Sequence, residues 1–216
     1  MTITLNQLVP APLAEKLARR SSQIWQQALT LQPGQWVKVK APSGTGKTTL
    51  IHCIWQLRTD FTGQVLFDNK PAADFTSAQL ASLRQEQLSV VFQDLRLFGQ
   101  LTALENIELK RQMSRSPYYP TSAITQMAEQ LGVSHVLHQR ASTCSYGEQQ
   151  RIAIIRALMQ PFSWLLMDEP FSHLDKENTT KAAALIAEEC AKRGAGFLLT
   201  DLDDDDHFAY TQYLNL

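Results

Sequence analysis

The chain alternates short apolar runs with longer segments of helical spacing. Apolar runs of strand length, bounded by polar or turn residues, lie at residues 35–41, 64–67, 88–92, 163–167 and 197–200. Apolar runs of this length and with these flanking residues are typical of buried parallel strands. A helix from about Lys47 to Leu57 is expected directly after the first of these strands. The pattern predicts an α/β core.

The segment between Leu95 and Met159 has a different pattern. Its apolar positions recur at helical spacing, and no run in it indicates a strand. We therefore expect an α/β core that is interrupted by a helical subdomain.

Composition and charge narrow the class of protein. The 216 residues are 44% hydrophobic and 19% charged, as in ordinary globular domains, which excludes a disordered or fibrous chain. The formal net charge of −1 argues against binding of nucleic acid through a basic overall field. Cys53, Cys144 and Cys190 lie far apart without CxxC spacing, so they indicate a reduced, intracellular chain rather than a disulfide framework or a zinc site.

The sequence predicts neither a signal peptide nor a membrane span. The N-terminal residues lack a basic cap followed by an apolar run. No apolar run approaches the roughly 18–20 residues that cross a bilayer. We expect a chain that is soluble by itself and that reaches a membrane only through a partner.

The turn between the first strand and its helix carries the first candidate chemistry. Ala41 to Thr49, APSGTGKTT, matches the phosphate-loop pattern GxxxxGK[ST], except that Ala41 replaces the first glycine. Small residues let successive backbone N–H groups surround phosphate oxygens, Lys47 would reach the β- and γ-phosphates, and Thr48 would ligate Mg²⁺. The alternative is a glycine-rich turn followed by an ordinary lysine. The position between a strand and a helix favours the phosphate loop.

Two carboxylates follow the strand at residues 163–167. Asp168 and Glu169 stand at its carboxyl end, where ligands of α/β sheets bind. One carboxylate can hold Mg²⁺, directly or through water, while the next polarises an attacking water. The alternative interpretation is a polar loop after a strand.

A third motif opens a strongly periodic helix. Cys144 to Arg151 reads CSYGEQQR, in which Ser145 is a good N-cap and Glu148 completes a capping box. The functional alternative is that this helix N-terminus, with its free amides and positive dipole end, faces a phosphate.

These motifs, in this order and spacing, resemble those of a known protein family. From about Leu29 to Leu202 the chain resembles ATP-binding cassette (ABC) ATPases. The matching stretches are the phosphate loop at 41–48, VVFQ ending in Gln93, the LSGGEQQR-like signature at 144–151, the acidic strand end at 164–169, and SHLD ending in Asp175. Leu101 to Ile107, LTALENI, is also similar to cassettes of the lipoprotein-release, cell-division and macrolide-export types.

The resemblance implies a fold and a domain organisation. The implied fold is α/β: a P-loop NTPase (RecA-like) core with a small antiparallel β subdomain and a helical subdomain. Residues 1–216 would form a single ABC ATPase domain, with the core at about 1–92 and 160–216 and the helical subdomain at about 93–159.

The family's roles fall on matching residues, with ATP and Mg²⁺ as the implied cofactors. Glu169 would be the general base, Gln93 would sense Mg²⁺ and the attacking water, and Asp201 stands at the catalytic switch position. The metal-site residues would be Thr48, Gln93 and Asp168. The residues implied to contact nucleotide are Ala41, Pro42, Ser43, Gly44, Thr45, Gly46, Lys47, Thr48, Thr49, Ser145, Gly147 and Asp175.

On this resemblance the protein works as a head-to-tail homodimer or paired cassette. Ser145 and Gly147 would reach the γ-phosphate of ATP bound by the other copy, and Asp175 would couple the two sites. A transmembrane partner on a separate chain would dock near the loop after Gln93, holding the cassette on the inner face of the cytoplasmic membrane. One alternative is a nucleotide-dependent dimerisation switch with slow or regulated hydrolysis. Another is a soluble cassette of DNA repair, which the short, heptad-free segment before Ser145 disfavours.

Four features depart from the family pattern. Ala41 replaces a glycine, and Cys144 and Tyr146 replace leucine and glycine in the signature. No adenine-stacking aromatic is evident, which leaves Arg19, Arg20 or Trp25 as candidates. Asp201 replaces the switch histidine, which implies weak basal ATPase activity, and His207 is a poor substitute. We expect Asp203 to Asp206 to form the acidic first turn of a following helix.

Overall fold

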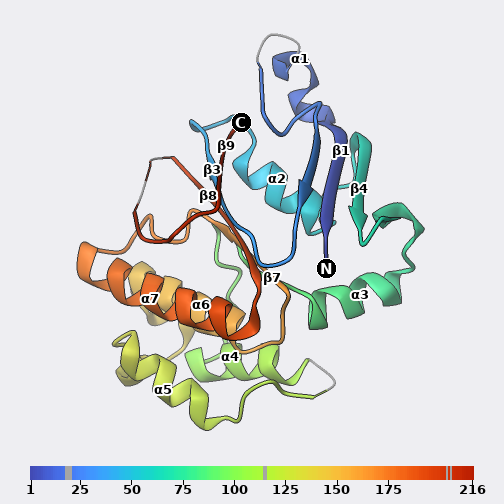
Figure 1. Cartoon of the computed structure of the whole chain (residues 1–216). Helices are drawn as coiled ribbons and strands as arrows, with labels where there is room; N and C mark the ends of the chain where they lie inside the picture. Colours follow the sequence, from blue (N-terminus) through green and yellow to red (C-terminus); the bar gives the residue numbers. More distant parts are fainter. Residues whose placement is uncertain (18–20, 114–115, 203, 205) are drawn as a thin grey trace.

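Two sheets organise the molecule (Figure 1). The computed structural model describes residues 1–17, 21–113, 116–202, 204 and 206–216. The five-stranded sheet has the order β6-β7-β8-β3-β9 and consists of β3 (Trp36–Lys40), β6 (Leu88–Val91), β7 (Trp164–Asp168), β8 (Gly196–Asp201) and β9 (Gln212–Asn215), all paired in parallel. The four-stranded antiparallel sheet has the order β2-β1-β4-β5 and consists of β1 (Ile3–Pro10), β2 (Ala28–Leu31), β4 (Phe61–Phe67) and β5 (Lys70–Pro71).

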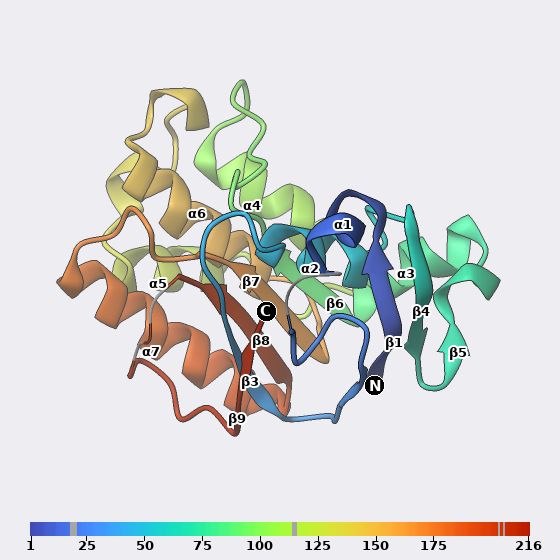
Figure 2. The same ribbon diagram turned by 90° about the horizontal axis from the view of Figure 1, so that it is seen from above.

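Helices pack on both sides of the parallel sheet, with α6 and α7 in one hydrophobic cluster beside β7 and α2 in the other. The helices of the structure are α1 (Ala14–Leu17), α2 (Lys47–Ile54), α3 (Ser77–Glu86), α4 (Ala103–Gln112), α5 (Ser122–Gln130), α6 (Tyr146–Leu158) and α7 (Lys176–Arg193). Seen from above, β1, β4 and β5 lie to one side of the parallel sheet and α4 to α7 to the other (Figure 2).

The central strands are apolar at successive positions because both of their faces are buried. Leu165 and Met167 of β7 belong to the hydrophobic cluster that contains α6 and α7. Trp164 and Leu166 of the same strand belong to the cluster that contains α2 and β1. Side chains of a strand alternate between its faces, so an uninterrupted apolar run fills both clusters.

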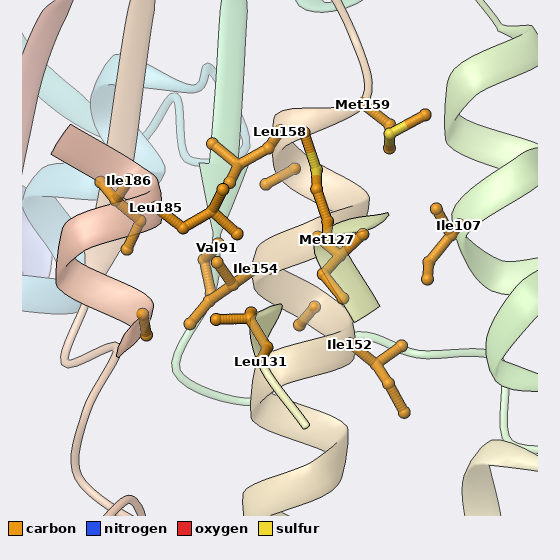
Figure 3. Packing of buried hydrophobic residues seen from close by; sticks show 14 of the residues in the cluster. Val91, Ile107, Met127, Leu131, Ile152, Ile154, Leu158, Met159, Leu185 and Ile186 are labelled. Atoms are coloured by element: carbon orange, nitrogen blue, oxygen red, sulfur yellow. The ribbon is translucent and has the colours of Figure 1, made fainter. Parts of the chain in front are cut away.

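Helix α6 lies at the centre of the first cluster (Figure 3). Ile152 and Ile154 are fully buried on it, with Ile107 of α4 on one side and Ile186 of α7 on the other. Its capping box at Ser145 and Glu148 fixes where this helix starts. The packing therefore holds the N-terminus of α6 at a defined place beside the sheet.

Most strand and helix predictions are confirmed, with small shifts at the ends. The helix expected to reach Leu57 ends at Ile54, and the strand expected at residues 64–67 starts at Phe61. The segment between Leu95 and Met159 holds α4, α5 and α6, as expected.

The prediction of a helix after Asp201 is wrong. None of the described residues from 204 to 211 is helical, and Gln212–Asn215 forms β9 beside β3. Asp204 pairs with Lys40 of β3, so a lysine of the neighbouring strand holds this acidic residue instead of a helix dipole. Asp203 and Asp205 of the same expected turn lie outside the described residues.

Candidate nucleotide-binding site

The loop between β3 and α2 has the backbone that phosphate binding needs. Gly44 and Gly46 have φ angles of +74° and +111°, which favour glycine. A Cβ on Gly46 would lie 2.6 Å from Leu13 Cδ1, so a side chain there would also have to displace the end of this leucine. Ala41 keeps a negative φ and is buried, and its N–H donates to the Asp201 carbonyl at 3.1 Å. An alanine at this place is therefore compatible with the loop.

Lys47 is the buried cation of this loop. Its Nζ donates to the carbonyls of Ala41 at 2.7 Å and Pro42 at 3.4 Å. It also forms an ion pair with Glu169 Oε1 at 3.1 Å. A buried ammonium needs such partners, because removal from water is otherwise strongly unfavourable. The structure thus brings together the phosphate-loop lysine and the expected base.

Side chains from three elements meet in front of Lys47. Gln93, which follows β6, donates through Nε2 to Glu169 Oε2 at 3.2 Å. Thr48 Oγ1 donates to Gln93 Oε1 at 3.3 Å. These two contacts and the Lys47–Glu169 pair join α2 to the carboxyl ends of β6 and β7.

Glu169 has a backbone conformation that non-glycine residues seldom adopt. Its φ is +48°. Its N–H donates to the Thr200 carbonyl at 2.9 Å, and its own carbonyl accepts from Gln150 Nε2 at 3.4 Å. Such a conformation persists where the surroundings over-determine it. Here β8 and α6 aim the carboxylate at Lys47 and Gln93.

Asp168 carries an oxygen that fits a cation. Its side chain is 1% exposed, and Oδ1 accepts from Thr200 Oγ1 at 2.7 Å. Its Oδ2 is buried and has no hydrogen-bond partner among the described residues. Together with Thr48 and Gln93 it offers the hard oxygen donors that Mg²⁺ prefers. The residues present therefore fit Mg²⁺.

A cavity of about 210 Å³ opens over the phosphate loop. Its described lining residues are Leu13, Ser43, Gly44, Gly46, Lys47, Thr48, Thr49, Gln93 and Glu169. Seven other residues expected to touch nucleotide or to act in catalysis do not line it in this protomer: Ala41, Pro42 and Thr45 of the phosphate loop, and Ser145, Gly147, Asp175 and Asp201.

Helix α6, which begins within the signature-like segment 144–151, has its N-cap residue Ser145 on the surface of the protomer. Ser145 is exposed, and its Oγ donates to Glu148 Oε2 at 2.8 Å, so the capping box is present. Asp175 caps α7 by accepting from the Asn178 N–H at 2.8 Å, a hydrogen bond that lowers the pKa of the aspartate. Both caps are accessible to a second molecule.

A small apolar cavity of about 20 Å³ adjoins the phosphate cavity through Leu13 and Gly44. Trp25 lines it and is 1% exposed. The Trp25 Nε1 has no hydrogen-bond partner among the described residues and would lie 3.4 Å from a Cβ on Gly46. Of the candidates for adenine stacking, Trp25 is thus beside the phosphate loop, whereas Arg19 and Arg20 lie outside the described residues.

Asp201 contacts a buried lysine that sequence reasoning missed. Lys38 of β3 is fully buried, and its Nζ forms an ion pair with Asp201 Oδ2 at 3.4 Å. The other oxygen, Oδ1, accepts from the Leu202 N–H at 2.7 Å. The signal was present in the sequence, since two lysines interrupt the otherwise apolar run WVKVK.

His207 does not stand in for the switch histidine in the phosphate cavity. Its ring lies 5.6 Å from the Phe171 ring in an edge-on contact, and it does not line the described wall of that cavity.

The parallel sheet, the glycine loop and the lysine–carboxylate cluster at the strand ends define a nucleotide-binding α/β protein of the P-loop class. A family model described as "ABC transporter" matches residues 26–172, and the chain belongs to this family. Within the described residues, no helix is long and apolar enough to cross a membrane.

Two solved structures of MJ0796 are similar over nearly the whole chain. One is the dimeric structure of MJ0796, described as a bacterial ABC transporter cassette, with 23% identity and a TM-score of 0.79 over 99% of this chain and 94% of that one. The other is a dimeric post-hydrolysis state of the ATP-binding cassette MJ0796 bound to ADP and Pi, with 25% identity and a TM-score of 0.78 over 93% and 88%. The expected α/β cassette fold, with its antiparallel sheet and helices, is thereby confirmed.

Proposed function

We propose that this protein is the ATP-binding and ATP-hydrolysing subunit of a membrane ABC complex and acts as a head-to-tail homodimer. The observation that carries the proposal is the cluster of Lys47, Glu169, Gln93 and Thr48 over a glycine loop at a helix N-terminus. Backbone N–H groups and a lysine at such a place form an anion site that suits phosphates.

The chain's own groups divide the work of hydrolysis. Residues 41–49 bind phosphates, with Lys47 on the β/γ oxygens and Thr49 at the α-phosphate. Thr48, Gln93 and Asp168 would hold Mg²⁺, which when bound neutralises charge on the phosphate oxygens. Lys47 now holds Glu169 at 3.1 Å, so nucleotide binding exchanges one anionic partner of this lysine for another. The released carboxylate can accept a proton from water.

The site of one protomer is incomplete without its partner. Ser145 and Gly147 lie outside the cavity of their own copy, and Ser145 is exposed at the start of α6. In a head-to-tail dimer they would face the γ-phosphate bound by the other copy, and Asp175 would connect the two sites. The similar MJ0796 cassette was crystallised as a dimer, which supports this arrangement.

A groove beside Gln93 supports docking of a membrane partner. It has a volume of about 180 Å³ and is lined by exposed apolar side chains, among them Phe98 and Met113, and by the cations Arg96, Lys110 and Arg156. Charge complementarity favours a short segment of the partner that carries apolar and acidic side chains. This partner would hold the cassette on the inner face of the cytoplasmic membrane. The LTALENI segment supports a cassette of the lipoprotein-release, cell-division or macrolide-export type.

One observation favours a dimerisation switch with slow hydrolysis as the second candidate. Asp201, at the switch position, is bound to Lys38 and not to a group of the phosphate cavity. Release of phosphate from Mg-ATP, measured with and without the membrane partner, separates an ATPase from such a switch. Lys110→Glu should abolish any effect of the partner, whereas the matched charge reversal Lys181→Glu on α7 should preserve it.

Titration with ATP tests the nucleotide site itself. Lys47→Ala should remove most ATP affinity, because the phosphates would lose the buried cation of this loop. An unchanged dissociation constant would contradict the phosphate-loop assignment.

A further inference from the structure

Tyr146 links parts of the site that lie far apart in the sequence. It is the first residue of α6 and directly follows Ser145. Its hydroxyl donates to the Gln93 carbonyl at 3.1 Å. The side chain of the same Gln93 bonds Thr48 and Glu169 in the phosphate cavity. Gln93 therefore touches the nucleotide site through its amide and the signature helix through its backbone.

The other side of Tyr146 rests on the loop that precedes α7. Its ring lies 4.2 Å from the His173 ring at an interplanar angle of 64°. Gly147 makes room for this approach, since a Cβ there would lie 3.2 Å from the His173 carbonyl oxygen. The first turn of α6 is thus held between Gln93 and His173.

A second set of contacts closes the connection. The His173 N–H donates to Gln150 Oε1 at 3.3 Å, and Gln150 Nε2 donates to the Glu169 carbonyl at 3.4 Å. Gln150 is one turn after Tyr146 on α6 and is 1% exposed. Contacts therefore run in a ring through Gln93, Glu169, Gln150, His173 and Tyr146.

We propose that Tyr146 is a positioning residue that couples the two nucleotide sites of the dimer. This inference rests on the proposed head-to-tail dimer. A change at Gln93, which contacts Glu169 and Thr48 in one site, moves the first turn of α6, whose Ser145 serves the other site. The LSGGEQQR pattern that residues 144–151 resemble has glycine at the position of Tyr146, so the resemblance does not imply this coupling through a side chain.

The Tyr146 hydroxyl also fixes the first turn of α6 before the dimer forms. A turn that is already fixed loses less conformational freedom when it is clamped against a partner. Removal of one such hydrogen bond is worth about two- to tenfold in an equilibrium constant. The loss should therefore appear in dimer formation and in communication between sites, and not in ATP binding by a single copy.

Three variants of the full-length chain isolate these contributions. Tyr146→Phe removes only the bond to Gln93, Tyr146→Gly also removes the contact with His173, and Tyr213→Phe alters an exposed tyrosine of β9 as the matched control. Binding of a fluorescent ATP analogue is measured at protein concentrations below dimerisation. Sedimentation velocity with saturating AMP-PNP gives the dimer dissociation constant, and phosphate release against ATP concentration gives the Hill coefficient.

We expect Tyr146→Phe to weaken the dimer about two- to tenfold and to lower the Hill coefficient toward 1, with affinity for the analogue unchanged. Tyr146→Gly should weaken the dimer at least as much, and Tyr213→Phe should match the wild type. The inference would be overturned if Tyr146→Phe had the dimer dissociation constant and the Hill coefficient of the wild type. It would also be overturned if the affinity of a single copy for the ATP analogue fell as much as dimerisation did. If the wild type itself forms no nucleotide-dependent dimer, the proposed function fails and this inference fails with it.

Discussion

Lys47 and Glu169 show how single residues of this site depend on one another. Each is the other's charge partner at 3.1 Å, and both side chains are largely buried. Glu169 also keeps a φ of +48°, a conformation fixed by bonds from Gln150 and to Thr200. At the scale of residues, the candidate base is aimed by backbone contacts and restrained by the lysine that would bind phosphate.

Glu169→Gln tests the general base. The amide cannot accept a proton from water, so hydrolysis should slow by about 10²–10⁴-fold while ATP binding is preserved. Loss of the ion pair frees Lys47 for phosphate, so the affinity for ATP should not fall. Phosphate release and an ATP titration on the same preparation measure both. A variant that hydrolyses at the wild-type rate would place the base elsewhere.

Asp201→His restores the family residue but removes the carboxylate next to the fully buried Lys38. We expect the free energy of unfolding to fall by about 2 kcal/mol, because the buried ammonium of Lys38 loses a carboxylate that lies 3.4 Å away, while the aspartate itself is partly exposed. Urea denaturation measures this loss. The double variant Lys38→Met, Asp201→His should recover most of it. Equal stability of Asp201→His and the wild type would show that the pair contributes nothing.

At the scale of elements, helix α4 forms one wall of the proposed docking groove. Asn106 is 1% exposed and fixes the loop that carries Phe98, through bonds to and from the Phe98 backbone of 2.8 and 3.0 Å. The same helix presents Lys110 to the groove. Burial, followed by the nearby charges of Arg156 and Arg84, lowers the pKa of Lys110 from 10.5 to about 8. The charged form of Lys110 therefore lowers the free energy of unfolding.

Lys110→Met should stabilise the protein at pH 7 by about 1 kcal/mol, after allowance for solvent screening. Below pH 8 Lys110 is protonated in the folded chain, where burial disfavours its charge. Between pH 8 and 10.5 the unfolded chain binds more protons than the folded chain, so the wild type gains stability as pH rises. The advantage of the variant should therefore shrink over this range. Urea denaturation at pH 7 and 10 checks the trend, and a constant difference would contradict the lowered pKa.

At the scale of the whole molecule, the proposed function depends on two copies of the chain. Signature residues lie outside the cavity of their own protomer, so a composite site would need Lys47 from one chain and Ser145 from the other. Each protomer would contribute one half to each of two sites. The parallel sheet holds Lys47 and Glu169 together, while α6 carries the signature residues outward.

Mixed dimers test this arrangement. Lys47→Ala and Ser145→Ala homodimers each lose one half of both sites. A heterodimer of the two concentrates both defects in one site and leaves the other intact, so mixing the inactive variants should restore part of the ATPase activity. Phosphate release after mixing, with each variant alone as control, measures this. Activity no higher than that of the separate variants would exclude sites shared between copies.

The sequence by itself determined the parts of this protein that are local. The phosphate loop, the acidic end of β7 and the capping box of α6 each lie within about ten consecutive residues, so their chemistry and spacing are visible without a fold. The apolar runs likewise identified five strands of the two sheets, since strands with buried faces are rich in apolar residues.

Only the tertiary structure decided which distant residues meet. Parallel strands are joined by crossover connections, so neighbours in the sheet are far apart in the chain, and Lys38 reaches Asp201 across 163 positions. Where the sequence predicted a helix after Asp201, Asp204 pairs with Lys40 of β3, and β9 pairs with the same strand. Tyr146 meets Gln93 and His173 for the same reason: packing of α6 beside the ends of β6 and β7 sets their distances, and no local pattern records it.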